Sequence, residues 1–244
     1  MGEMMRNYLS MVFGVNSVAL YLLMQDLKME FEAVFVNHGG DWPETYEYAD
    51  YFTGTGRQVT ILKPSAGTKE KIVFDNIVEY SRFRKITPSR RSRWCTDRFK
   101  TVPIYKYVQV PCFMHIGFAA DEAGRASINT EKNVENRYLL IEHGITRDGC
   151  IDLIQKAGLK IPMKSGCYIC PFQGLLQFKE LRGKHPELFC NSQTIELQQN
   201  NRTKQDGTPW KKYYLCGVPL GKIDQQTFLP NLEKAEYPPC QCGL

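Results

Sequence analysis

The chain has 244 residues, of which 43% are hydrophobic and 23% charged, and its formal net charge is +5. This composition is typical of a folded globular protein and excludes a disordered or low-complexity chain. The first residues are too polar for a secretory signal peptide, and the longest early apolar run, residues 18–24, is far shorter than a membrane span. We therefore expect a cytoplasmic protein with reduced thiols and no membrane segment.

The first half of the chain alternates strand and helix patterns. Apolar and β-branched runs predict strands at residues 8–12, 31–36, 58–62 and 112–117, and helical spacing predicts helices at residues 18–28 and 44–53. Ser17 is placed to cap the first helix, and Pro43 suits the start of the second. This alternation predicts an α/β fold with a doubly wound, mostly parallel sheet.

The second half is mainly helical. Residues 146–157 predict a helix capped by Thr146 or Asp148, and residues 175–199 predict helical structure with a break near His185. A polar segment at 200–209 follows, and residues 229–244 are expected to form an extended tail. The chain is expected to divide into an α/β domain at 1–160 and a helical, cysteine-bearing region at 161–244.

Ligands of parallel α/β sheets bind beyond the carboxyl ends of the strands. This rule selects residues 13–17, 37–45 and 117–125 as one rim, where the first helix offers free N–H groups to a phosphate. A basic patch at 81–85 and 89–93 also suits phosphate groups, on a nucleotide or on nucleic acid. A solvated basic loop is the simpler alternative.

Nine cysteines are present, and two of them, Cys167 and Cys170, form a CxxC motif. In a reducing compartment this spacing indicates metal ligation or redox chemistry rather than a structural disulfide. The motif alone does not choose between a metal and a redox role.

Six segments in order carry a resemblance to a known family. Residues 10–20 resemble a Ser-x-x-Phe-Gly nucleotide loop, residues 36–46 a second loop ending in Pro-Glu-Thr, and residues 117–125 a third loop, with a strand expected at 138–141. Residues 93–103 and the final Cys-Gly-Leu are similar to the cysteine segments of adenylyl-sulfate (APS) reductases. The chain thus resembles the phosphoadenylyl-sulfate (PAPS) and APS reductases of the adenine nucleotide alpha-hydrolase-like superfamily. The resemblance covers most of the chain and implies a Rossmann-like, adenine-nucleotide-binding domain at 1–160.

The resemblance implies an enzyme of sulfur metabolism that binds APS, PAPS or ATP. The residues that it assigns to substrate binding lie in or beside these loops: Ser10, Phe13, Gly14, Asn16, Ser17, Asn37, Gly39, Glu44, Thr45 and Arg93. Lys100 and Arg125 are expected to neutralise sulfate or phosphate charge during catalysis. The thiolate of Cys242 is expected to attack the sulfonate sulfur, and a thioredoxin-like reductant then resolves the S-sulfocysteine.

The resemblance also implies a cysteine-bound [4Fe–4S] cluster. Cys95, Cys167 and Cys170 match three ligand positions, whereas Thr96 stands at the fourth. Cys150 is the first choice for the missing ligand, Cys242 is the second, and an open iron site is the third. Zinc held by the same four thiolates is the alternative.

Three functions stay open at this point. The first is a thiol-dependent PAPS or APS reductase-like oxidoreductase. The second is an ATP-using sulfurtransferase that acts on nucleic acid, by DNA phosphorothioation or tRNA thiolation; it is favoured by the arginine-rich segment. Asn16 argues against efficient ATP cleavage, because related pyrophosphatases place a Mg²⁺-holding Asp there. The third is a zinc-stabilised nucleic-acid-binding module, which leaves the strand-end loops without a role.

Overall fold

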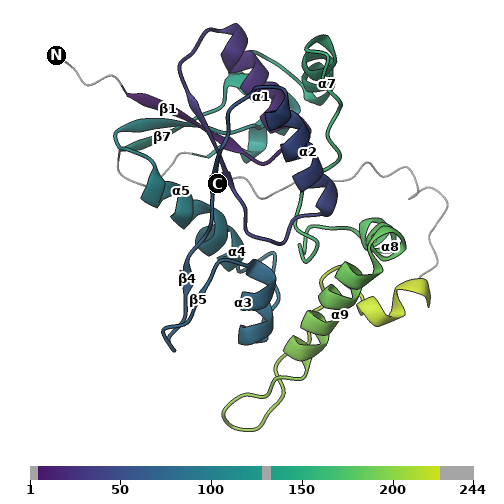
Figure 1. Cartoon of the computed structure of the whole chain (residues 1–244). Coiled ribbons are helices and arrows are strands. Elements are labelled where there is room, and N and C mark those ends of the chain that lie inside the picture. Colours follow the sequence, from purple (N-terminus) through teal and green to yellow (C-terminus); the bar gives the residue numbers. More distant parts are fainter. Residues whose placement is uncertain (1–4, 128–132, 226–244) are drawn as a thin grey trace.

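The computed structural model describes residues 5–127 and 133–225. Its centre is a five-stranded sheet with the order β3-β2-β1-β6-β7 (Figure 1). The strands are β1 (Arg6–Met11), β2 (Glu32–Val36), β3 (Thr60–Leu62), β6 (Cys112–His115) and β7 (Val134–Arg137). All four pairings are parallel, which confirms the expected α/β sheet.

Helices cover both faces of the sheet. On one face α1 (Val15–Asp26), α2 (Pro43–Gly54), α6 (Leu139–Glu142) and α7 (Arg147–Lys156) bury a first core with Leu9 and Phe35. On the other face α5 (Val102–Tyr107) packs against Tyr8 and Val34. Neighbouring residues of β1 and β2 therefore point to opposite cores, as the two-residue period of a strand requires.

A second body of structure packs beside the sheet, in the lower half of Figure 1. Its elements are the hairpin β4 (Ala66–Gly67) and β5 (Val73–Phe74), α3 (Ile77–Arg84), α4 (Trp94–Thr96), the π-helix η1 (Asp97–Thr101), α8 (Leu175–Lys184), α9 (Pro186–Asn200) and the 3-10 helix η3 (Leu220–Gln225). The core of this second body is built from two separate parts of the chain, residues 42–99 and residues 167–223. This core therefore crosses the boundary expected at residue 160.

The first helix begins three residues earlier than predicted. Its N-cap is Gly14, which makes no side-chain capping bond, so the prediction of Ser17 as the cap is wrong. Ser17 lies inside the first turn, where its hydroxyl donates to the Gly14 carbonyl at 3.1 Å and accepts from the Val12 amide at 3.3 Å. The loop between β1 and α1 is short because Phe13 takes a left-handed backbone conformation, with φ 53°. This conformation changes the direction of the chain directly before Gly14.

The strand expected at 138–141 is also misplaced. The strand is β7, and the residues after it form α6, whose Leu139 and Leu140 are buried in the first core. A short apolar run fits a buried strand and a buried helix turn equally well, so periodicity could not separate them.

The remaining predicted elements agree with the structure. Pro43 occupies the first turn of α2, the Thr146 hydroxyl caps α7 by accepting from the Gly149 amide at 3.4 Å, and α8 ends at His185. The tail at 229–244 lies outside the described residues. Within the described ranges, no helix has the length and apolar character needed to cross a bilayer.

His115 gives the fold a measurable pH dependence. The ring is 2% exposed, its Nε2 lies 3.0 Å from the Asn7 Oδ1, and burial, assisted by Arg137, lowers the pKa of His115 to about 4. The unfolded chain protonates this ring near pH 6.5. Stability from the neutral ring is therefore complete above pH 6.5 and is lost as pH falls towards 4, by up to about 3 kcal/mol.

Urea unfolding of the wild type and of His115→Gln between pH 7.5 and 4 would test this. The stability difference between the two proteins should shrink as the pH falls through this window. A difference that stays constant with pH would contradict the assignment.

Candidate functional site

The loops after β1 and β6 meet at the carboxyl edge of the sheet. A Cβ on Gly117 would lie 3.0 Å from the Asn16 carbonyl carbon and from the Ser17 amide nitrogen, so a side chain there would push the two backbones apart. A Cβ on Gly14 would lie 2.5 Å from the Ser165 Oγ. The segment that precedes the CxxC motif therefore rests directly on the first loop.

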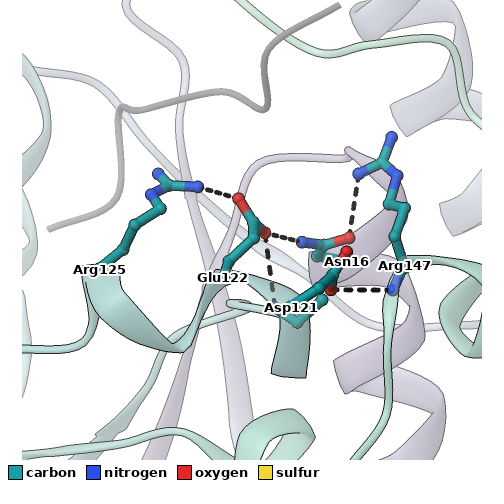
Figure 2. A network of polar contacts seen from close by, with 6 residues as sticks. Asn16, Asp121, Glu122, Arg125 and Arg147 are labelled. Carbon is teal, nitrogen blue, oxygen red and sulfur yellow. Dashed lines mark hydrogen bonds and ion pairs between the residues drawn. The ribbon is translucent and has the colours of Figure 1, made fainter. Parts of the chain in front are cut away.

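A polar network joins the first loop, the 3-10 helix η2 (Ala120–Arg125) and the start of α7 (Figure 2). The Asn16 Nδ2 donates to the Glu122 Oε2 at 2.6 Å, and the Asn16 Oδ1 accepts from Arg147 Nη1 at 3.0 Å. Glu122 also pairs with Arg125, and the Arg147 amide donates to the Asp121 Oδ1 at 3.1 Å. Asn16 is 8% exposed, so both ends of a nearly buried amide are satisfied.

Only an amide suits this position in the network. The Glu122 carboxylate needs a donor, and the Arg147 guanidinium needs an acceptor. An aspartate at position 16 could accept from Arg147 but would place a second carboxylate against Glu122. The network thus gives a physical reason for Asn16 in this chain.

Arg125 is held by an aromatic stack as well as by Glu122. Its Cζ lies 4.3 Å from the centroid of the Phe118 ring, and Phe118 stacks on Tyr138 at 5.6 Å with an interplanar angle of 10°. A cation over an aromatic face and a carboxylate partner together fix the orientation of the guanidinium. Arg125 therefore stands at the third loop, as predicted.

The CxxC loop docks against the loop after β2. Asp41 and Cys167 form an isolated antiparallel bridge, in which the Trp42 amide donates to the Gly166 carbonyl at 3.1 Å and the Tyr168 amide donates to the Gly40 carbonyl at 2.9 Å. A Cβ on Gly40 would lie 2.9 Å from the Cys167 Sγ. The missing side chain at position 40 lets the thiol approach the backbone.

Three thiols gather at this place. Burial raises the pKa of Cys167 well above its usual range, and Asp41, Cys170 and Cys95 raise it further. Burial likewise raises the pKa of Cys170, with Cys95 as a further cause and Lys100 acting against it. Cys95 comes from α4, more than seventy residues before the CxxC motif. Cys95, Cys167 and Cys170 thus belong to the same core and influence one another's pKa.

By residue type the three cysteines fit a thiolate-bound metal group, because zinc and iron–sulfur centres prefer sulfur ligands. Buried thiols beside a carboxylate stay protonated on their own, whereas a bound cation would favour the thiolates. A single tetrahedral zinc ion needs its sulfur ligands about 3.8 Å apart. In the described parts of the chain, no three His, Cys, Asp or Glu side chains are arranged to hold a single metal ion.

Cys150 is separated from this group. It is fully buried in the first core, and burial raises its pKa to about 12, with Arg147, Asp121 and Glu122 as its charged neighbours. Cys150 lies on the side of α7 that packs against α1, because a helical period puts it on the same face as Ile154. The structure does not place Cys150 with the other three thiols, contrary to our first choice of fourth ligand. Cys242, the second choice, lies outside the described residues.

Lys164 connects the network to the thiols. Its Nζ donates to the Gln177 Oε1 at 3.2 Å, and burial lowers the pKa of Lys164 to about 8, with Arg147 lowering it further and Cys170 opposing the change. Lys100 from η1 is a charged neighbour of both Cys170 and His38. Lys100 and Lys164 are therefore both close enough to Cys170 to lower the pKa of its thiol.

Several predicted substrate-binding side chains face inwards instead. The Phe13 ring is 1% exposed and packs 4.9 Å from the Phe35 ring, so only its backbone can face a ligand. The Ser17 hydroxyl is bonded within its own turn, and Thr45 is 4% exposed. Glu44 accepts from His185 at 3.0 Å, which ties α2 to the α8–α9 junction. These side chains stabilise the loops.

Other predicted residues stay near the rim. The Asn37 Oδ1 accepts from the Gly39 amide at 3.1 Å, and Gly39 needs its φ of +71°, which favours glycine. Ser10 is half-buried in β1. Arg93 is exposed at the start of α4, where its Nη2 donates to the Thr96 hydroxyl at 3.4 Å.

Sequence reasoning missed Asp41, Glu122, Arg147 and Lys164. Glu122 follows Asp121 within the third loop, and Lys164 precedes the CxxC motif by three residues, so both were within reach of motif analysis. Asp41 likewise lies within the second loop, whereas Arg147 had no such signal, because its role depends on a contact with the distant Asn16.

A large cleft lies elsewhere. It has a volume of about 910 Å³, sits at the amino ends of β2 and β3, and is lined by Tyr21, Lys28 and Thr60 among others. None of the network or thiol residues lines it. Ligands of parallel sheets bind at the opposite edge, so we do not assign this cleft to the chemistry.

The Asn16 network predicts a specific stability pattern. Asn16→Asp should lower the free energy of unfolding by about 2 kcal/mol at pH 7, because it sets two carboxylates against each other in a nearly buried site. Glu122→Gln, added to this variant, should restore at least half of the loss, since an amide again faces a carboxylate.

Urea unfolding of the wild type, both single variants and the double variant would complete the cycle. An unchanged stability of Asn16→Asp, or effects of the two changes that simply add, would rule out the direct contact.

Comparison with known families gives one match. Residues 6–123 match the family model described as the phosphoadenosine phosphosulfate reductase domain, a range that runs from β1 into η2. Comparison with curated proteins gave no match. The matched range contains the first two rim loops and the third as far as residue 123, with Asn16, Asp41 and Glu122, as well as Cys95 and Lys100. Over residues 6–123 the chain is therefore similar to the phosphoadenosine phosphosulfate reductase domain.

Proposed function

We propose that this protein is a PAPS or APS reductase-like oxidoreductase, which binds an adenylyl-sulfate-type nucleotide along the rim and uses a cysteine thiolate in sulfur transfer. The observation that carries the proposal is the direct contact between the nucleotide loop and the CxxC segment. Ser165 packs on Gly14, and both Arg147 and Cys170 influence the pKa of the adjacent Lys164. A ligand whose phosphate lies on the loop would thus have its reacting end near the thiols.

The phosphates would lie at the start of α1. This helix has 12 residues, no acidic residue in its first turn and no side-chain cap, so its first amides can donate to an anion. Arg147 and Lys164 add positive charge on the same side. Lys100 and Arg125 would neutralise the sulfate or phosphates from the two neighbouring loops.

The sulfur chemistry would use the tail. The Cys242 thiolate attacks the sulfonate sulfur, the bond from this sulfur to the bridging phosphate oxygen breaks, and the nucleotide leaves with its phosphate. A thioredoxin-like thiol then attacks the S-sulfocysteine, releasing sulfite and leaving a disulfide. Neighbouring cations such as Lys164 and Lys100 would favour the attacking thiolate. A reducing, cytoplasmic setting keeps these thiols available.

We further propose that Cys95, Cys167 and Cys170 hold a [4Fe–4S] cluster. When bound, such a cluster supplies a redox-active, sulfur-ligated centre beside the nucleotide. The fourth position then belongs to Cys242 or stays open, since Cys150 lies in the other core. Zinc with the same thiolates is the alternative, and iron, zinc and acid-labile sulfide analysis of anaerobically purified protein decides between them.

Alanine substitution separates the metal ligands from the buried structural cysteines. Cys95→Ala, Cys167→Ala and Cys170→Ala should each lose at least half of the bound metal per chain. Cys112→Ala and Cys150→Ala, which remove fully buried thiols from the cores on the two faces of the sheet, should keep it. Retained metal in the first three variants, or loss in Cys150→Ala with the fold intact, would contradict this ligand set.

Turnover tests the proposed reaction. Metal-loaded protein with a thioredoxin-like reductant should release sulfite from APS or PAPS, with AMP or adenosine 3′,5′-bisphosphate as the other product. Cys242→Ser should abolish sulfite release but keep nucleotide binding, and Cys240→Ser is the matched control in the same tail.

No sulfite from either nucleotide would exclude the reductase function. Release of pyrophosphate or AMP from ATP under the same conditions would instead support the nucleic-acid sulfurtransferase.

A further inference from the structure

Positive charge in this chain is concentrated in two segments. Residues 81–93 contain six Arg and Lys residues and no acidic residue, and residues 200–214 contain four, with Asp206 as the only acidic residue. Together the two segments carry a net charge of +9, so the other residues sum to −4 within the chain's total of +5. Such clustering of cations produces a local positive field that is stronger than the net charge of the whole chain indicates.

The fold places the two segments side by side. The Arg202 Nη1 donates to the Lys85 carbonyl at 3.5 Å, and the Thr87 hydroxyl donates to the Gln199 Oε1 at 2.7 Å. Figure 1 shows the loop after α9 extending beside the end of α3. We call the surface formed by residues 81–93 and 200–214 the basic face.

The basic face also exposes aromatic surface. Trp210 is 47% exposed and Phe83 is 42% exposed, although both are large apolar side chains. The Arg202 guanidinium lies 5.3 Å from the Trp210 ring centroid, which holds the indole in place within the hairpin-like loop. Most of the cations around these rings, including Arg82, Lys204 and Lys211, are exposed.

The basic face reaches the thiol site. The Arg90 Nε donates to the Pro171 carbonyl at 3.1 Å, and its Cζ lies 5.6 Å from the Phe172 ring centroid. These residues directly follow Cys170 of the CxxC motif. A ligand that lies along the basic face can therefore extend towards the three thiols.

We propose that the basic face binds single-stranded nucleic acid. A phosphate backbone fits a surface with many exposed cations and almost no carboxylates, and unstacked bases fit exposed rings that are flanked by guanidinium groups. An acidic peptide would use the same cations but has no need of the indole. This binding goes beyond the proposed nucleotide chemistry and does not depend on it.

Fluorescence anisotropy with the full-length protein tests the proposal. The probe is a labelled, mixed-sequence 20-nucleotide strand, as DNA and as RNA, titrated at several salt concentrations. The logarithm of the binding constant should fall with the logarithm of salt concentration with a slope of about −0.7 for each phosphate contact. Arg91→Glu combined with Lys211→Glu should weaken binding at least tenfold and make this slope shallower.

Two further variants separate specific binding from general charge effects. Lys106→Glu combined with Lys156→Glu makes the same charge change on exposed lysines outside the basic face, and should change affinity less than twofold. Trp210→Ala should weaken single-strand binding several-fold without changing the salt slope. Thermal unfolding of each variant confirms that it is folded.

Three results would overturn the proposal. The first is no binding of either strand at low salt. The second is an equal loss of affinity in the Lys106/Lys156 control. The third is equally tight binding of polyglutamate or duplex DNA with no effect of Trp210→Ala, which would assign the face to an acidic protein or to a duplex.

Discussion

The site depends on one short antiparallel contact, between residues 40–42 and residues 166–168. Two backbone hydrogen bonds and the missing side chain of Gly40 seat the Cys167 thiol against the loop after β2. Since the sheet fixes that loop, the contact also fixes the CxxC motif relative to the nucleotide rim. The second core and the contact between Glu44 and His185 then hold the helical region that follows.

A second constraint acts within the rim itself. Asn16 joins the first loop to the third through Glu122 and to α7 through Arg147, and Gly117 lets the two backbones touch. The loops are thus ordered before any ligand binds, which reduces the entropy that binding would cost. Phe13 supports this order, because its buried ring compensates for a backbone conformation that a bulky residue rarely adopts.

The second core explains why the thiol site and the basic face are neighbours. It combines α3 and α4 from the first half of the chain with α8 and α9 from the second. The arginine-rich segment runs from α3 to α4, and the other half of the basic face follows α9. One core therefore holds Cys95 near the CxxC motif and also joins the two halves of the basic face. The three thiols and the basic face are therefore supported by the same core.

The sequence by itself determined the α/β class, most strands and helices and the family resemblance, because periodicity, turn residues and motif order are local properties. It misplaced the start of α1 and the strand near residue 138, where a left-handed Phe13 and burial in the first core overrode the pattern. Only the tertiary structure separated Cys150 from the other thiols and revealed Asp41, Arg147 and the joined basic face. These features are contacts between residues far apart in the chain, which no local pattern encodes.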